Sequence, residues 1–198
     1  MKLSQLMMIA GLLVMTTAAE AQLRLGEPAY GGSGCPAGSA AVTVSPDEQA
    51  ISVLFDQYTV EAGRTTGRRL DRKNCNLTIP VQVPQGYSVS VFQVDYRGYL
   101  AVPRGGMARF DAEYFWAGSR GPRLSRQFNG PTNDLFTLTD ELLARTLVWT
   151  RCGESVNLRV NTSILVQANS NMDQTLGQVD SADVSSGVIY HLQWKRCN

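Results

Sequence analysis

The chain has 198 residues, and its 18 lysines and arginines nearly balance its 17 aspartates and glutamates, which gives a formal net charge of +1. Proteins whose main partner is nucleic acid or an anionic membrane surface carry a clear basic excess, so this balance argues against both classes. Residues 22–198 are enough for one domain with a hydrophobic core and too few for two comfortable ones.

The first residues have the order of a secretory signal peptide. Lys2 precedes an apolar run over residues 6–15, and small residues follow up to Ala21. We therefore predict a signal peptide over residues 1–21 and a single secreted domain, extracellular or periplasmic, over residues 22–198. A membrane anchor is the alternative, but the run has about half of the roughly 20 apolar residues that a bilayer requires. The residue directly after Ala21 is Gln22 and not a cysteine, so a lipid anchor is not supported.

Four cysteines follow the signal peptide, namely Cys35, Cys75, Cys152 and Cys197. An even number in an exported chain is typical of disulfide bonds, and four cysteines allow three connectivities. We favour Cys35 with Cys75 and Cys152 with Cys197, because sequential pairing would staple each half of the chain. Closing a loop of about forty residues contributes roughly 4 kcal/mol in the chain-entropy model. A structural zinc site is the alternative, but CxxC spacing is missing.

The first half of the domain alternates between turns and strands. Residues 22–38 are rich in glycine and proline and predict an irregular arm held by a disulfide. Residues 40–44 and 51–60 predict a hairpin that turns at residues 45–47. Two long strands then follow, joined by a turn at residues 84–86. The first has apolar residues at every second position from Leu77 to Val83, and the second runs from Tyr87 to Tyr99.

In the second strand the apolar residues change parity. Val89 and Val91 fall on one side of an extended chain, whereas Val94 and Tyr96 fall on the other. A regular strand has a period of two, so this pattern predicts a strand with apolar residues on both faces.

The second half is read in the same way. Residues 107–116 alternate strictly and predict a strand with one core face, and residues 118–130 predict a long surface loop with at most one short strand. Phe136 and Leu138 alternate as in a strand, whereas residues 139–143 are typical of a capped helix start. Residues 146–152 and 156–166 predict a hairpin, and residues 169–187 an exposed, mobile segment. Residues 188–197 predict the final strand.

Eight to ten short strands with little helix indicate an all-β fold. We predict an antiparallel β-sandwich, jelly-roll-like, closed by two disulfides.

Several fragments, taken in order, resemble a known family. They are GSGCP at residues 32–36, KNCNL at 73–77, DYRGY at 95–99, Trp149 with Cys152 and Gly153, and Trp194 with Cys197. Together they resemble the exported proteins grouped as domain-of-unknown-function family 4360, over nearly all of residues 22–198. The resemblance implies a secreted, disulfide-containing domain of bacteria and fungi, and it lends no catalytic residues.

One set of residues suggests a ligand-binding face. Asp95, Asp111 and Glu113 fall on successive predicted strands, beside the aromatic residues Tyr96 and Tyr99. If the strands bring them together, polar groups beside aromatic rings would suit a sugar, and a pair of carboxylates is also what glycoside hydrolysis requires. The simpler alternative is a solvated strand face.

Other chemistry has weaker support. His191 is the only histidine and therefore the only base for a serine triad, and no GxSxG motif is present. A calcium site would use the acidic and amide side chains after residue 168, but the glycine that bends a calcium loop is missing. Those side chains belong to Asn169, Asn171, Asp173, Asp180 and Asp183. We predict no metal and no cofactor.

Two further patterns concern modification and charge. Asn76 and Asn161 each begin an N-glycosylation acceptor sequence. A basic cluster over residues 64–73 predicts a solvated loop, with a polyanion site as the alternative.

From the sequence we therefore expect a non-enzymatic secreted protein. It would bind a cell-surface or extracellular polysaccharide or protein, or act as a surface or matrix component. A secreted hydrolase that uses Asp95, Asp111 and Glu113 is the alternative.

Overall fold

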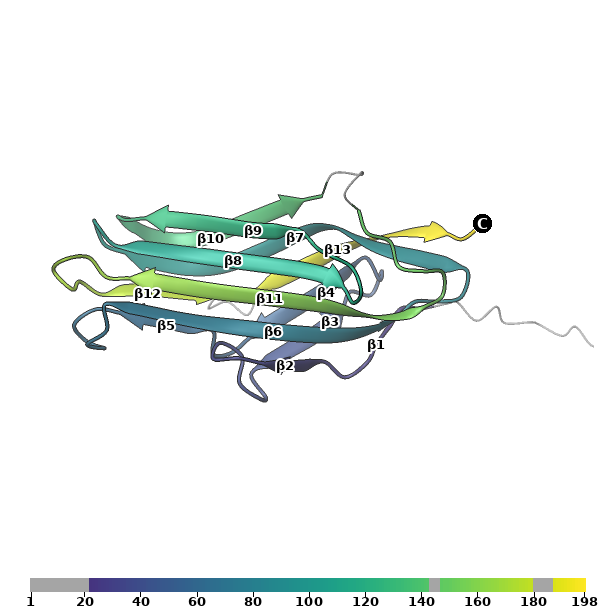
Figure 1. Ribbon diagram of the computed structural model, residues 1–198, viewed down its shortest axis with the longest axis horizontal. Helices are drawn as coiled ribbons and strands as arrows, with labels where there is room; N and C mark the ends of the chain where they lie inside the picture. The colour runs from purple at the N-terminus through teal and green to yellow at the C-terminus, as the bar shows by residue number, and fades with distance from the viewer. Residues whose placement is uncertain (1–21, 143–146, 180–186) are drawn as a thin grey trace, which may run out of the picture.

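The computed structural model describes residues 22–142, 147–179 and 187–198, and the predicted signal peptide lies outside the described residues (Figure 1). The described residues form thirteen β-strands and no helix. The strands make two stacked antiparallel sheets, called sheet A and sheet B below. The predicted all-β sandwich is confirmed. The expected eight to ten strands were too few, because short strands in the arm and in segments predicted as loops also join the sheets.

Sheet A consists of strands that span the front of the molecule in Figure 1. Their order is β1 (Arg24–Leu25), β6 (Leu70–Gln82), β11 (Ser155–Gln167), β8 (Met107–Trp116) and β9 (Arg123–Asn129), with β2 (Ala29–Gly31) also paired to β6. The arm predicted as irregular thus contributes two short strands to this sheet.

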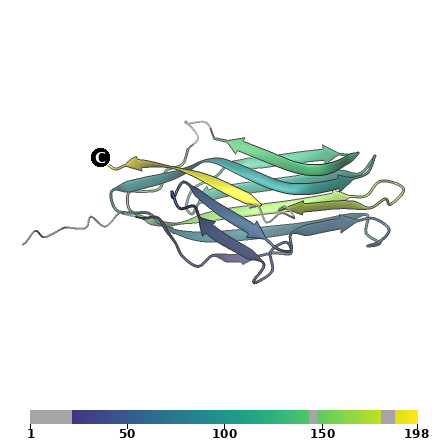
Figure 2. The ribbon, with the colours of Figure 1, turned by 180° about the vertical axis from the view of Figure 1, so that it is seen from behind.

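Sheet B lies behind sheet A and is seen from its own side in Figure 2. Its order is β3 (Ala40–Val44), β4 (Ala50–Phe55), β13 (Val188–Arg196), β7 (Tyr87–Val102), β12 (Thr175–Val179) and β5 (Thr59–Ala62), with β10 (Thr132–Glu141) also paired to β7. β13 and β12 pair with successive parts of β7, and β10 runs along the opposite edge of β7.

The core lies between the sheets and follows the alternation in the sequence. Leu77, Ile79 and Val81 of β6 are buried, as are Phe110 and Tyr114 of β8. The two long strands on either side of the turn at residues 84–86 are confirmed as β6 and β7. They belong to different sheets, so the turn carries the chain from sheet A to sheet B.

A β-bulge explains the change of parity in β7. The register with β13 shifts so that His191 opposes Gln93 and Leu192 opposes Val91, which leaves Phe92 as the extra residue. As a result Val91 and Val94 are both buried, on the same side of the sheet. The expectation of two apolar faces was wrong, because the bulge restores one core face.

Two further segments differ from prediction. Residues 132–141 form the continuous strand β10, so the helix expected from residue 139 does not begin there. Ten residues of β10 pair with β7, and this pairing outweighs the local helix signal. Residues 147–152 form no strand, but this segment is hydrogen-bonded to β7. The Thr150 N–H donates to the Val89 carbonyl, and the Val148 carbonyl accepts a hydrogen bond from Ser90 Oγ.

The predicted mobile segment after residue 168 contains an ordered strand. Thr175–Val179 is β12, which pairs with β5 and β7. Two small residues bring it close to the core, because Gly177 faces Ile164 and Val166, and Thr175 is fully buried. Residues 180–186 of that prediction lie outside the described residues.

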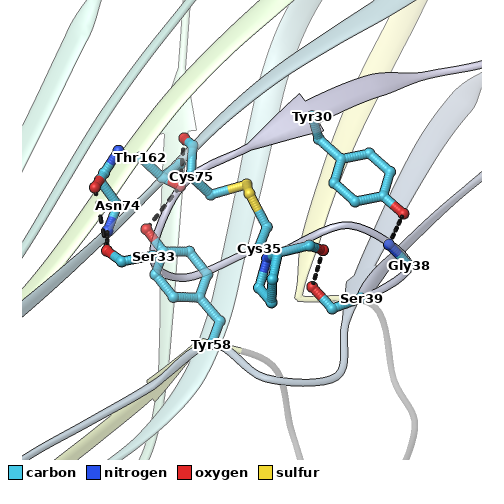
Figure 3. The surroundings of a disulfide bond; sticks show 10 residues. Tyr30, Ser33, Cys35, Gly38, Ser39, Tyr58, Asn74, Cys75 and Thr162 are labelled. Atoms are coloured by element: carbon cyan, nitrogen blue, oxygen red, sulfur yellow. Dashed lines mark hydrogen bonds between the residues drawn. A yellow bond between two sulfur atoms is a disulfide. The ribbon is translucent and has the colours of Figure 1, made fainter.

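The two disulfides have the favoured pairing. Cys35–Cys75 ties the N-terminal arm to β6, and both residues lie in the core (Figure 3). Cys152–Cys197 joins the chain before β11 to the chain after β13, close to the surface. Each bridge closes a loop of about forty residues, with sequence separations of 40 and 45.

The arm has further anchors around the first disulfide. The Tyr58 hydroxyl is hydrogen-bonded to Thr162 Oγ1 at 3.0 Å, in the core below the arm (Figure 3). The Gly34 N–H donates to the Asn74 carbonyl, and an added Cβ at Gly34 would lie 2.2 Å from the Tyr58 ring. A glycine is therefore required there, because the arm runs directly over the ring.

Candidate functional site

The structure divides the predicted ligand face between three places. Tyr96 is fully buried between the sheets and contacts no solvent. Asp95 and Tyr99 lie on the outer face of sheet B, in β7. Asp111 and Glu113 lie in β8, on the outer face of sheet A. The five residues therefore do not converge, because β7 and β8 belong to different sheets.

The outer face of sheet A carries an open cleft of about 660 Å³, which we call the sheet A cleft. Four neighbouring strands line it, β6, β11, β8 and β9, which lie side by side in Figure 1. The side chains that line it include Arg72, Asn76, Asp111, Glu113, Arg123 and Asn161. Most of the lining is polar, and the cleft faces solvent.

Strand register sets these side chains in two rows across the sheet. One row is Asn76, Asn161, Glu113 and Arg123, and the other is Asn74, Ser163, Asp111 and Ser125. Residues directly opposite on paired strands have their side chains about 5 Å apart, so each row is continuous. Two cross-strand ladders of hydrogen-bonding groups result.

Asp111 is the centre of the second row. Its carboxylate accepts hydrogen bonds from Ser125 Oγ at 2.6 Å and from Arg109 Nε at 3.0 Å. Ser163 Oγ lies 3.4 Å from the same carboxylate and accepts a hydrogen bond from Arg72 at 3.1 Å. A hydrogen-bonded chain thus crosses from β6 to β9.

Glu113 is the centre of the first row. Arg123 donates to both of its carboxylate oxygens, at 3.0 and 3.4 Å. This pair is two-pronged but partly open to water, so we expect it to contribute less than about 1 kcal/mol to stability. Beside it, the side chains of Asn76 and Asn161 make no hydrogen bond within the described residues, and they remain free for a ligand.

Several residues of this cleft were not identified from the sequence. Arg123 and Ser125 fell in a segment predicted as a surface loop, which the structure shows to be β9. Asn161 and Ser163 were detectable, because they alternate with the apolar residues of the strand predicted over residues 156–166. Both glycosylation acceptor asparagines, Asn76 and Asn161, lie opposite one another in the first row.

The outer face of sheet B holds a second polar cluster, around Asp95. One carboxylate oxygen lies 2.8 Å from His191 Nε2, and the other accepts a hydrogen bond from Thr139 Oγ1 at 2.7 Å. Gln93 also donates to both oxygens, at 3.3 Å. Burial by itself would raise the pKa of Asp95, but the hydrogen bonds from Thr139, His191 and Gln93 outweigh it and lower that pKa below 3.8.

His191 is the only residue that could have served a serine triad. It lies on the outer face of β13, and its side chain is 30% exposed. Its Nε2 atom faces Asp95, and its ring lies 6.0 Å from that of Phe92 at the bulge.

The proposed calcium ligands have other partners. Asn169 is buried, and its amide donates to the Arg104 carbonyl and to the Asp173 carboxylate. Asp180 and Asp183 lie outside the described residues. Within the described residues there is no group of three or more His, Cys, Asp or Glu side chains that could hold a metal ion.

The basic cluster over residues 64–73 does not form one patch. Arg68 pairs with Asp71 at 2.9 Å, and Arg64 donates to the Asn171 carbonyl. Arg72 points the other way and lines the sheet A cleft. Only one member of the sequence cluster therefore reaches the site.

Tyrosines form a polar cluster inside the core. Tyr114 donates to the Asp140 carboxylate at 3.0 Å, and its ring lies 6.0 Å from that of Tyr190. The hydroxyls of Tyr96 and Tyr190 are buried and have no hydrogen-bond partner among the described residues. Burial raises the pKa of Tyr96 and of Tyr190, so both stay neutral phenols.

Comparison with known proteins gives a family and little else. The family model described as a domain of unknown function (DUF4360) matches residues 21–197. A protein of Arthroderma benhamiae described as an uncharacterized secreted protein is 32% identical over 169 residues, which are 85% of this chain and 69% of that protein.

One solved structure with low similarity is TmCBM61 in complex with beta-1,4-galactotriose. It is 10% identical, has a TM-score of 0.34, and the alignment covers 85% of this chain and 88% of that one. A TM-score this low supports no conclusion about a shared ligand. None of the described residues form a helix that is long and apolar enough to cross a membrane.

Proposed function

We propose that this chain, which belongs to the DUF4360 family, is a secreted protein that binds a polysaccharide in the sheet A cleft and catalyses no reaction on it. Export is supported by the N-terminal sequence, by the two disulfides and by the secreted relative. The extracellular space or the periplasm is where such bridges persist.

The observation that carries the proposal is the pair of polar rows across four strands. Amides, hydroxyls, carboxylates and guanidinium groups offer donors and acceptors at regular spacing, on a rigid sheet. Sugar hydroxyls both donate and accept, so such a surface suits a chain of sugars. Asn76 and Asn161 supply hydrogen-bonding capacity that the protein itself does not use.

The alternative is a glycoside hydrolase with Asp111 and Glu113 as its carboxylates. Against it, both carboxylates already accept hydrogen bonds from arginines, Arg109 and Arg123, and so act as fixed acceptors in the polar rows. Asp95, the third carboxylate of that hypothesis, lies on the other sheet.

The test replaces Asp111 by Asn and Glu113 by Gln in one variant. We expect retention on polysaccharides in affinity electrophoresis to fall at least tenfold, and reducing-sugar release to be zero for both proteins. A matched control, D134N/E141Q, changes the same chemical groups on exposed positions of β10 and should bind like the wild type. Sugar release by the wild type that the D111N/E113Q variant loses would establish the hydrolase instead.

A further inference from the structure

We propose that the polysaccharide bound in the sheet A cleft is anionic and carries carboxylate groups, and that the Arg72 guanidinium contacts them. This inference rests on the proposed function, because it concerns the ligand of the same cleft. It follows from the charges on the outer face of sheet A.

That face carries more arginines than carboxylates. Strand register places five arginines on it, Arg24, Arg72, Arg109, Arg123 and Arg159, against the two carboxylates of Asp111 and Glu113. The chain as a whole has a formal charge of only +1, so positive charge is concentrated here. A surface of this kind attracts anionic ligands.

The ion pairs show which arginines remain available. Arg109 lies 3.0 Å from Asp111, and Arg123 lies 3.0 Å from Glu113, so these charges compensate one another. Within the described residues Arg24, Arg72 and Arg159 have no carboxylate partner. Of these three only Arg72 lines the cleft, and its one side-chain hydrogen bond goes to Ser163 Oγ. A guanidinium has five N–H donors, so most of those of Arg72 remain for a ligand.

The remaining donors suit a carboxylate. Arginine presents its N–H groups as a planar fork that matches the two oxygens of a carboxylate, and such two-pronged bonds are stronger than neutral ones. Ser163 holds one branch of the fork, which orients the guanidinium before a ligand arrives. Arg72 lines the cleft beside Asn74 and Asn76, so a sugar acid held by Arg72 would have amide groups next to its hydroxyls.

The same face suits a sugar acid better than a nucleic acid. Nucleic acids carry a phosphate on every residue and are bound through many Lys and Arg contacts. Here Asp111 and Glu113 lie in β8, one of the two middle strands of the cleft, and their carboxylate oxygens accept hydrogen bonds but cannot donate them to a phosphate. A sugar acid has hydroxyl groups that can donate to Asp111 and Glu113, beside the carboxylate that Arg72 would bind.

The experiment compares an acidic polymer with its neutral methyl ester. Polygalacturonate and its methyl ester share one backbone, and the ester lacks the free carboxylates. We expect binding measured by isothermal titration calorimetry to be at least tenfold weaker for the ester. Raising the salt concentration should weaken binding to the acid and leave binding to the ester unchanged.

Single substitutions then test whether Arg72 contacts the carboxylates of the ligand. Arg72→Gln should reduce binding to polygalacturonate about tenfold and leave binding to the ester unchanged, whereas Arg72→Lys should keep the salt dependence with intermediate affinity. Arg97→Gln is the matched control, because Arg97 lies on the outer face of sheet B. Circular dichroism and the thermal midpoint check that each variant is folded.

The outcomes separate the two proposals. Equal binding of acid and ester, or wild-type binding by Arg72→Gln, overturns the anionic ligand. If the protein instead retains a neutral galactan, and D111N/E113Q loses it, the proposed function stands without this inference. If no polysaccharide in an acidic and neutral panel is retained, both proposals are wrong.

Discussion

The two outer faces of the sandwich use polar side chains in different ways. On sheet A, the rows through Glu113 and Asp111 line an open cleft, and Asn76 and Asn161 have unused hydrogen-bonding groups. On sheet B, both oxygens of Asp95 are engaged by side chains of the protein itself. Sheet B also exposes apolar side chains, with Leu135 61% and Phe92 37% exposed.

Because of this difference, we expect ligand binding and folding stability to depend on different faces of the sandwich. Polar groups that satisfy one another add to the free energy of unfolding, whereas groups that stay available add to ligand affinity. Substitutions on sheet B should therefore change stability, and substitutions in the sheet A cleft should change binding. The predictions below test that division.

The largest effect should come from the disulfide that supports sheet A. Replacing Cys35 and Cys75 by serine should lower the free energy of unfolding by about 4 kcal/mol or more. The loop lengths of the two bridges are similar, but Cys35 and Cys75 are in the core, so the serine hydroxyls would also be buried. Urea unfolding measures the loss.

The comparison variant replaces Cys152 and Cys197, which lie nearer the surface. Its loss should be smaller than that of the Cys35 and Cys75 variant. An equal or larger loss would mean that burial of the sulfurs adds nothing to the stability of the fold.

The next effect concerns Asp95 on sheet B. Asp95→Asn should destabilise the protein by about 1–2 kcal/mol at pH 7, because it removes hydrogen bonds to a charged carboxylate. The folded-state pKa is lowered below 3.8, so the stabilisation is complete above that pH and is lost as the pH falls through the folded-state value. The gap between wild type and variant should therefore shrink towards pH 3.

Urea unfolding at pH 7 and pH 3 tests this prediction. A gap that stays constant with pH would show that the carboxylate charge does not contribute. Binding to polysaccharide should not change, because Asp95 is on the face opposite the cleft.

A smaller effect is expected inside the core. Tyr58→Phe removes the hydrogen bond to Thr162 and should cost about 1 kcal/mol. Tyr190→Phe removes a buried hydroxyl that has no partner and should be neutral or slightly stabilising. Thermal unfolding of the two variants gives the comparison. A large loss for Tyr190→Phe would reveal a partner such as a buried water.

The smallest effect on stability should come from the cleft. Glu113→Gln breaks a partly exposed pair with Arg123 and should change the free energy of unfolding by less than about 1 kcal/mol. Polysaccharide affinity should nevertheless fall. A variant that loses stability and keeps affinity would reverse the division between the two faces.

The sequence alone determined the fold class and the core face of most strands, and it favoured the disulfide pairing that the structure has. Leu77, Ile79 and Val81 alternate, as do the apolar residues of β8, because a strand between core and solvent must have a period of two. The cysteines added long-range constraints that local patterns lack. The same period of two placed Asp111 and Glu113 on the solvent-facing side of their strand.

Only the tertiary structure decided which strands share a sheet. β7 and β8 are neighbours in sequence but belong to different sheets, so Asp95 and Asp111 separate. The bulge at Phe92 and the strand β9 are likewise set by pairing with distant strands. Hydrogen bonds and packing between segments far apart in the chain choose these arrangements, and no local pattern of residues contains them.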